Sequence, residues 1–307
     1  AIIHQAMPPL LIAAPAPLSG KTTVAVALGQ RFKDAGRTVA LLRLSGDDHA
    51  ADDARLFAGL AFNVSRRPEP VEAAAVAVAD ADLTLIEAPA GDPRQAAERL
   101  SAKTVVVVAY ADPLPADIPS FCEAMGDSCA GVIITRVPSR RLEATRVAAE
   151  AIGVRIVVLV PEDRLLAAPS LGAIAEALEA ETSSLNSARD NIIDRPVISS
   201  ISVDPAQGYF ADYSPNAVIV RGDKPDQQLG ALNAGVPCLI ITGGLPLLSY
   251  VEDRAQEEEI PLLKTRYNTV ATIERLEPLY GATPFSGQAK VERIVQLTTD
   301  LDLASLA

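Results

Sequence analysis

The first 180 residues alternate between short apolar runs and Ala-rich amphipathic stretches. The runs are four to eight residues long and rich in Val, Ile and Leu, and helix-compatible sequence joins each run to the next. Continuous apolar runs of this length are typical of strands that are buried on both faces of a parallel sheet. The pattern therefore predicts an α/β fold with a doubly wound, mostly parallel sheet. The predicted strands are 10–14, 38–44, 82–88, 104–110, 131–137 and 155–160.

A polar, Ser-rich stretch at 179–190 interrupts this alternation, and we place a domain boundary there. After it the chain restarts with VISSISV and continues with apolar runs and amphipathic segments of the same kind. We therefore expect two domains, 1–180 and 190–307, of which the second is a smaller α/β unit. Its predicted strands include 216–223, 237–244 and 260–265.

Composition narrows the classes of protein that fit. Hydrophobic residues make up 49% of the 307 positions, which excludes a wholly disordered chain. Lys and Arg number 27 against 39 Asp and Glu, a formal net charge of −12. A surface that negative repels phosphate backbones and anionic lipids, so we expect no nucleic-acid or membrane partner. No apolar run approaches the ~18 residues of a membrane span, and we expect a cytoplasmic protein.

The segment Ser19–Thr23 lies between the first predicted strand and the helix after it, which is the position of a P-loop. In such a loop, backbone N–H groups and the helix N-terminus bind phosphate oxygens, the Lys neutralises them and the Thr ligates Mg²⁺. The pattern G-x-x-x-x-G-K-[ST] is incomplete, because Pro15 stands at the first Gly and Pro17 removes another backbone donor. Phosphate binding is the favoured interpretation, and a chance GKTT or a loop without nucleotide affinity is the alternative. The candidate phosphate-binding residues are Ser19, Gly20, Lys21, Thr22 and Thr23.

A magnesium ion beside a P-loop needs an acidic protein ligand. Glu87 ends the third predicted strand, and a carboxylate at the carboxyl end of a parallel strand faces the ligand crevice. A solvated strand end is the alternative for Glu87. The loop after the second strand offers more acids, of which one or two could reach a metal while the others form an exposed, helix-capping loop. These acids are Asp47, Asp48, Asp52 and Asp53.

Other loops carry weaker signals. Residues 160–164, after the last strand of the first domain, either contact a nucleotide base or cap the next helix. In the second domain, polar loops at 221–226 and 242–244 follow neighbouring strands, and a small ligand pocket and plain structural turns fit them equally well. No Ser/His/Asp triad can be assembled, because the only histidines are His4 and His49.

Several segments, taken in order, resemble a known family. In the first domain they are APLSGKTTVAVALG, DDARLFAGL, LTLIEAPAG, GVIITRVP and VPEDRLLAAPSLGAIAEAL. They resemble the dethiobiotin-synthetase-like P-loop domain at the N-terminus of long phosphate acetyltransferases. The segments ISVDPAQGYF, VIVRGDKPDQQLGAL and CLIITGGL resemble the DRTGG domain that follows it there. This resemblance to the phosphotransacetylase family covers nearly the whole chain.

The resemblance implies ATP or another nucleotide, with Mg²⁺, as the ligands of the first domain. It also implies a regulatory second domain that self-associates into a homodimer and offers a surface to a protein partner. Gly20, Lys21 and Thr22 match the phosphate loop, and Arg136 matches the Arg of an Asn-Arg pair near the nucleotide. The implied metal ligands are Thr22, Asp53 and Glu87.

The chain departs from the family pattern at several points. Arg43 stands at the position of a Lys that assists the carbamate reaction, and Arg does not exchange a proton at neutral pH. Thr135 replaces the Asn of the Asn-Arg pair, which argues against a strict adenine preference. Asp223–Pro225 replaces the Asp-Arg-Thr start of the DRTGG signature. In the family, the acetyltransferase domain follows the DRTGG domain, and the sequence up to Ala307 does not contain it. We therefore expect no acetyl phosphate synthesis by this chain itself.

Three functional hypotheses follow from these residues. The first is a nucleotide-sensing regulatory protein, in which the first domain binds Mg-nucleotide and the DRTGG-like domain mediates dimerisation or partner contact. The second is an ATP-dependent ligase of the dethiobiotin-synthetase type, or at most a weak ATPase. The third is a scaffold that no longer binds nucleotide, which Pro15 and Pro17 suggest.

Overall fold

The computed structural model describes residues 7–76, 81–199, 210 and 212–306. The chain divides into two compact units. Unit 1 comprises the residues up to Asp163 together with those from Lys290 onward, and unit 2 comprises Arg164–Ala289. Among the described residues, every helix is too short or too polar to cross a membrane.

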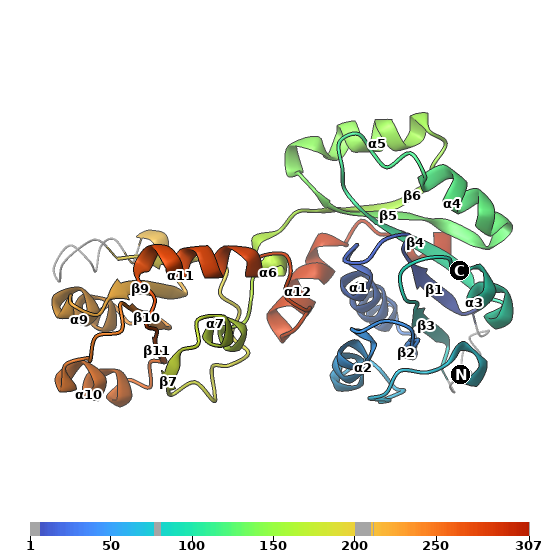
Figure 1. The fold of residues 1–307 in the computed structure, drawn as a ribbon. Helices are drawn as coiled ribbons and strands as arrows, with labels where there is room; N and C mark the ends of the chain where they lie inside the picture. The colour runs from blue at the N-terminus through green and yellow to red at the C-terminus, as the bar shows by residue number, and fades with distance from the viewer. Residues whose placement is uncertain (1–6, 77–80, 200–209, 211, 307) are drawn as a thin grey trace. The chain divides into compact units, whose positions relative to one another are not determined.

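Unit 1 is built on a six-stranded sheet with the order β2-β3-β1-β4-β5-β6 (Figure 1). All its strand pairs are parallel, which confirms the predicted α/β class. β1, β2 and β3 are buried along their whole length because helices cover the sheet, as their continuous apolar sequences predict. The strands are β1 (Leu10–Ala13), β2 (Val39–Arg43), β3 (Leu83–Glu87), β4 (Lys103–Ala109), β5 (Cys129–Val137) and β6 (Ile156–Pro161).

Helix α1 (Lys21–Asp34) follows β1 and contacts β1, β2 and β3. Val24, Leu28 and Phe32, spaced four residues apart, lie on one side of this helix and are buried. The other helices of unit 1 are α2 (Ala50–Gly59), α3 (Arg94–Leu100), α4 (Ile118–Met125), α5 (Leu142–Ala151) and α12 (Gln288–Leu297), which belongs to the unit from Lys290. Short 3₁₀ turns are η1 (Ala73–Ala75), η2 (Gly126–Ser128), η3 (Ser139–Arg141) and η5 (Leu303–Leu306).

The strand order places the predicted loops at one edge of this sheet. The chain runs from β1 to β2 on one side, returns through β3, and then crosses β1 to reach β4 on the other side. Ligands of open α/β sheets bind outside the carboxyl ends of the strands at such a reversal. The ends of β1 and β3, neighbours in the sheet, therefore define the candidate site of unit 1.

Unit 2 has a five-stranded sheet with the order β7-β11-β10-β9-β8. Its strand pairs are parallel except for the edge pair of β7 and β11. The strands are β7 (Glu181–Ser183), β8 (Pro196–Ile198), β9 (Ala217–Arg221), β10 (Leu239–Thr242) and β11 (Leu262–Lys264). The helices are α6 (Arg164–Ala167), α7 (Leu171–Ala177), α9 (Pro225–Asn233), α10 (Ser249–Glu257) and α11 (Thr269–Leu276), with the 3₁₀ turn η4 (Glu277–Leu279).

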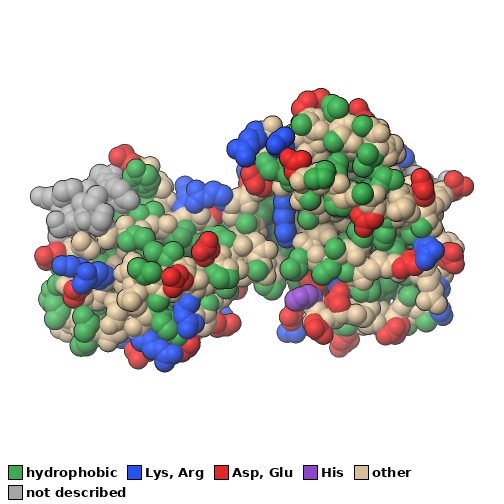
Figure 2. All heavy atoms as spheres, turned by 45° about the horizontal axis from the view of Figure 1, so that its top comes forward, with side chains coloured by type: hydrophobic (Ala, Val, Ile, Leu, Met, Phe, Trp, Pro, Cys, Tyr) green, Lys and Arg blue, Asp and Glu red, His purple; other side chains and the backbone are tan. Residues whose placement is uncertain are grey.

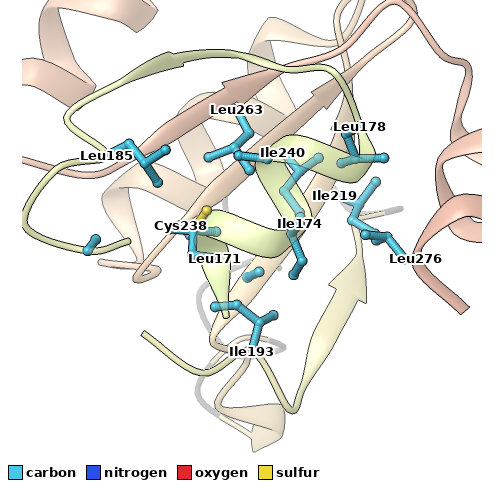
Figure 3. Close-up of a cluster of buried hydrophobic side chains, with 13 residues drawn as sticks. Leu171, Ile174, Leu178, Leu185, Ile193, Ile219, Cys238, Ile240, Leu263 and Leu276 are labelled. Atoms are coloured by element: carbon cyan, nitrogen blue, oxygen red, sulfur yellow. The ribbon is translucent and has the colours of Figure 1, made fainter. Parts of the chain in front are cut away.

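The structure divides the chain at a different place from the predicted boundary. The helix segment that we assigned to the first domain is α7, whose Ile174 and Leu178 pack with Ile219, Ile240 and Leu263 of the second sheet (Figure 3). An amphipathic pattern shows that a helix buries one face, but not which sheet covers it. The helix therefore belongs to unit 2.

Two further segments differ from the prediction. The Ser-rich stretch that we took as a boundary contains β7, which pairs antiparallel with β11. The last residues of the chain return to unit 1, where Arg293 forms an ion pair with Asp163 at 2.7 Å. Residues 200–209, which carry most of the ISVDPAQGYF segment, and His4 lie outside the described residues.

Candidate functional site

The loop between β1 and α1 leaves the N-terminus of the helix open. Gly20 precedes the helix with φ +88°, in the left-handed region that favours glycine. Among the residues that the structure describes, no side chain caps the first amides of α1, which have no partner within the helix. An uncapped N-terminus of a 14-residue helix carries partial positive charge and binds anions readily. The local geometry is thus that of a phosphate-binding loop.

Two residues at the carboxyl end of β5 bind backbone carbonyls of this loop. The hydroxyl of buried Thr135 donates a hydrogen bond to the carbonyl of Ser19 at 2.8 Å. The guanidinium of Arg136 donates to the carbonyl of Leu18, also at 2.8 Å. Arg136 was predicted to lie near a nucleotide, and here its side chain contacts the loop that would hold the phosphates. The two residues at the positions of the family's Asn-Arg pair thus both bind loop carbonyls.

Three residues from separate parts of the sequence meet beside the loop. The hydroxyl of Thr22, in the first turn of α1, lies 3.1 Å from Oε1 of Glu87 at the end of β3. It also lies 3.4 Å from Oδ1 of Asp53 on α2. These are the three residues that the sequence proposes as metal ligands, and the structure brings them together.

Glu87 is 1% exposed, and its Oε2 has no hydrogen-bond partner in the described structure. Burial raises the pKa of Glu87 to about 8, although the nearby charge of Arg43 acts in the opposite direction. Asp53 is less buried, and burial raises the pKa of its carboxyl as well. For both acids, the nearby positive charges therefore do not fully offset the cost of burying a negative carboxylate.

Arg43, the last residue of β2, lies at the centre of the acidic residues. Its side chain is 2% exposed and its Nη2 lies 2.6 and 2.7 Å from the two carboxylate oxygens of Asp47. Its Nε lies 3.2 Å from Asp53 and 3.7 Å from Glu87. The sequence marked Arg43 only as a family departure and did not predict that one guanidinium contacts three carboxylates. A charged residue that ends an apolar strand, four positions before an Asp, was the available signal.

Lys21 is 7% exposed and points into the same charged region. Burial lowers the pKa of Lys21, and Glu87 is the strongest of the nearby charges that act against this. Within the described part of the chain, Lys21 has no ion-pair partner. Its charge is therefore available to an anion at the N-terminus of α1.

The other acids of the loop lie farther from this centre. Asp52 forms an exposed ion pair with Arg55 at 2.5 Å, and Asp48 and His49 are exposed.

Two other predicted segments have their own places in the structure. Asp163, in the predicted 160–164 loop, pairs with Arg293. Thr23, the last predicted phosphate-binding residue, is half-buried in the first turn of α1.

Residues 173–279 match the model of the DRTGG domain. Unit 2 contains a DRTGG domain. The match lies within Arg164–Ala289 and includes the three strands β9, β10 and β11. The domain predicted from three short segments is thereby confirmed.

Three solved structures are similar to parts of this chain. The CBS and DRTGG domains of the regulatory region of Clostridium perfringens pyrophosphatase, complexed with the activator diadenosine tetraphosphate, are 15% identical over 45% of this chain, with a TM-score of 0.32. The chain covers 56% of that structure. MinD from Pyrococcus horikoshii, complexed with Mg-ADP, is 18% identical over 52% of this chain and 82% of its own, with a TM-score of 0.36.

The third is a nucleotide-binding protein from Archaeoglobus fulgidus in complex with ADP. It is 15% identical over 50% of this chain and 82% of its own, with a TM-score of 0.38.

In the DRTGG domain, the two predicted loops follow adjacent strands. Arg221 at the end of β9 is in register with Thr242 at the end of β10. Arg221 pairs with Asp223 at 2.5 Å, and the hydroxyl of Thr242 lies 3.0 Å from that of Thr269. The amides of Gly243 and Gly244 both donate to backbone carbonyls. These contacts fix the two loops to each other's surroundings, with Gly243 and Gly244 bound to the carbonyls of Tyr267 and Thr265.

On the face shown in Figure 2, acidic and basic side chains are interspersed over the surface of each unit. Among the described residues, no three His, Cys, Asp or Glu side chains form a cluster suited to a metal. A metal at the loop would need the hydroxyl of Thr22 in addition to Asp53 and Glu87. This set of hard oxygen donors, with the unpartnered Oε2 of Glu87, fits Mg²⁺.

Proposed function

We propose that unit 1 binds a nucleotide by its phosphates and that the protein is a nucleotide-binding regulatory protein. The observation that carries this proposal is the position of Lys21. Lys21 is buried at the N-terminus of α1, beside Thr22 and Glu87, and among the described residues it has no ion-pair partner and the helix end has no side-chain cap. A cation and free amides at one helix end are the elements that bind a phosphate group.

The phosphate groups would be bound by the loop and the first turn of α1. Backbone amides supply directed hydrogen bonds, and Lys21 supplies the charge. Thr135 and Arg136 act indirectly, since they hold the carbonyls of Ser19 and Leu18. Pro15 and Pro17 reduce the number of donors, so we expect lower affinity than in a loop that carries glycines there. The phosphate-binding residues in this proposal are Ser19, Gly20, Lys21, Thr22 and Thr23.

A magnesium ion that accompanies the nucleotide would be held by Thr22, Asp53 and Glu87. The ion would neutralise phosphate charge and the two carboxylates together. ATP is the nucleotide implied by the family resemblance.

The regulatory part of the proposal rests on the DRTGG domain. A DRTGG domain also belongs to the regulatory region of the Clostridium perfringens pyrophosphatase. We propose that this domain of the present chain mediates self-association into a homodimer, or contact with a protein partner. Leu245, Leu248 and Tyr250 follow β10 and are about half exposed, which suits a surface that is covered by another protein. Sedimentation of the full chain, with and without nucleotide, measures the oligomeric state.

The ligase alternative has less support. Arg43 stands at the position of the family's reactive Lys, and its guanidinium is fixed by Asp47, Asp53 and Glu87. It therefore neither exchanges a proton nor turns freely toward a substrate. We propose that catalysis is at most weak nucleotide hydrolysis.

The test is a calorimetric titration of ATP, ADP and GTP with Mg²⁺ into the wild type, Lys21→Ala and the exposed control Lys33→Ala. We expect saturable binding that is lost in Lys21→Ala and retained in Lys33→Ala. Absence of binding to the folded wild type at millimolar nucleotide would refute the proposal and favour a scaffold. Where binding occurs, steady-state phosphate release distinguishes a sensor from an ATPase, and release that depends on a carboxylate substrate would instead support a ligase.

A further inference from the structure

Arg43 already supplies a positive charge at the place where a metal ion would be bound. Its Nε lies 3.2 Å from Oδ2 of Asp53 and 3.7 Å from Oε1 of Glu87. These two carboxylates are the acidic members of the proposed metal site. The same guanidinium is thus a neighbour of both acidic metal ligands.

Hydrogen bonds to Asp47 and to the backbone hold the guanidinium of Arg43 in place. Its Nη2 forms two hydrogen bonds with Asp47, and its Nη1 donates to the carbonyl of Leu44 at 2.7 Å. The side chain is 2% exposed, so solvent does little to screen its charge. An Arg side chain stays protonated at any physiological pH and cannot relieve repulsion by losing a proton. Its charge is therefore a permanent part of the site.

The Thr22 hydroxyl lies beside both carboxylates. It contacts Oδ1 of Asp53, the oxygen that Arg43 does not contact, and Oε1 of Glu87, which Arg43 also approaches. A metal ion bound beside these oxygens would lie close to a fixed positive charge that already pairs with the same carboxylates. Coulomb repulsion in a buried site weakens the binding of such an ion substantially.

We propose that Arg43 is a resident counter-cation that suppresses the binding of free divalent metal, so that the metal enters mainly together with the phosphates of a ligand. This inference rests on the proposed function for the location of the metal site. The phosphates bring negative charge that offsets the charge of Arg43, and the metal and the nucleotide therefore bind with positive cooperativity. Arg43 acts here as a residue that determines specificity for metal-nucleotide over metal alone.

The experiment is a calorimetric titration of Mg²⁺ alone into the full chain. It compares the wild type with Arg43→Met and Arg43→Gln, which remove the charge, and with Arg43→Lys, which keeps it. The matched control is Arg55→Met, because Arg55 is an exposed Arg of the same unit that pairs with Asp52. Circular dichroism establishes that each variant is folded.

We expect weak binding of Mg²⁺ to the wild type, with an affinity about tenfold or more higher in Arg43→Met and Arg43→Gln. Arg43→Lys and Arg55→Met should stay within about threefold of the wild type. Gln retains hydrogen-bonding groups toward Leu44 and Asp47, so it provides the test if the Met variant does not fold. Micromolar binding to the wild type, or unchanged or weaker binding to the variants without charge, would overturn the inference.

The proposed function fails in a different way. If the wild type binds no nucleotide, the P-loop proposal is refuted. Tighter Mg²⁺ binding by Arg43→Met would still establish Arg43 as a counter-cation. Conversely, if nucleotide binding depends on Lys21 but substitutions of Arg43 leave the Mg²⁺ affinity unchanged, the proposed function is supported and the role of Arg43 is refuted.

Discussion

The hydroxyl of Thr22 lies 3.1 Å from the carboxylate of Glu87, a residue 65 positions later in the chain. This contact joins the first turn of α1 to the end of β3, and it exists because β1 and β3 are neighbours in the sheet. A hydroxyl and a buried carboxylate are thereby placed at the N-terminus of a helix whose first amides are uncapped.

The pKa of Glu87 leads to a prediction about stability and pH. Burial raises it from 4.5 to about 8 in the folded state. Between these values the folded protein keeps a proton that the unfolded chain has lost, so the free energy of unfolding falls as pH rises, by at most about 1.4 kcal/mol per unit. Glu87→Gln cannot titrate, and its stability relative to wild type should increase over this interval.

Urea denaturation at several pH values measures this effect. Glu98→Gln, an exposed change on α3, is the control and should follow the pH dependence of the wild type. A stability difference between Glu87→Gln and the wild type that stays constant from about pH 4.5 to about pH 8 would contradict the assigned shift.

Thr135 and Thr104 provide a matched pair of buried hydroxyls in unit 1. The Thr135 hydroxyl donates to the carbonyl of Ser19, whereas that of Thr104 has no partner in the described structure. Thr135→Val leaves a loop carbonyl without its donor and should cost about 1–3 kcal/mol, with weaker phosphate binding. Thr104→Val should be neutral or stabilising, because it removes an unpaired polar group. Equal losses in the two variants by chemical denaturation would argue against loop support by Thr135.

Gly20 and Gly36 both have φ values in the left-handed region, at +88° and +84°. An Ala at either position should lose about 1–2 kcal/mol from backbone strain. At Gly20 the added methyl would also lie 3.3 Å from Cγ2 of Thr135, whereas at Gly36 it would meet nothing within 4 Å. We therefore expect Gly20→Ala to be the more destabilising and to weaken nucleotide binding, which denaturation and calorimetry measure. Identical stability losses and unaltered affinity would show that the loop tolerates the crowding.

Lys290 on α12 is 1% exposed, and burial lowers the pKa of its ammonium from 10.5 to about 8. At pH 7 the charge is buried in the folded state, so Lys290→Met should stabilise the protein by roughly 1–3 kcal/mol. Between about pH 8 and 10.5 only the unfolded chain binds the proton, so the stability of the wild type rises and the advantage of the variant shrinks. Thermal unfolding tests this, with exposed Lys33→Met as the control. Destabilisation at pH 7 would mean that the ammonium is stabilised in the folded state.

The sequence predicted the strands of the first sheet well, because parallel strands that are buried on both faces have continuous apolar sequences. It also placed Lys21 and Thr22 at a helix N-terminus and Glu87 at a strand end, since glycine and apolar runs mark those positions locally. The positions of Thr22 and Glu87 in the sequence already indicated a shared metal site, and the family resemblance singled out Asp53 among the acids of its loop. Strand order, which brings these residues together, has no local signature.

Two features could not be read from local pattern. The apolar face of α7 fits any sheet, and only the packing of Ile174 against Ile219 and Ile240 assigns it to the second unit. The network around Arg43 depends on three acids that come from a loop, a helix and another strand. Burial of a guanidinium is an exception to the usual exposure of Arg, and tertiary contacts alone reveal it.

The most direct test of the central claim is hydrogen–deuterium exchange of the full chain with and without saturating ADP and Mg²⁺. If phosphates bind at the N-terminus of α1, exchange should slow for the amides of residues 19–23 in the wild type, and remain unchanged there in Lys21→Ala. The loops of the DRTGG domain serve as an internal reference. Unchanged exchange at residues 19–23, or slowing confined to the DRTGG domain, would contradict phosphate binding by the loop of unit 1.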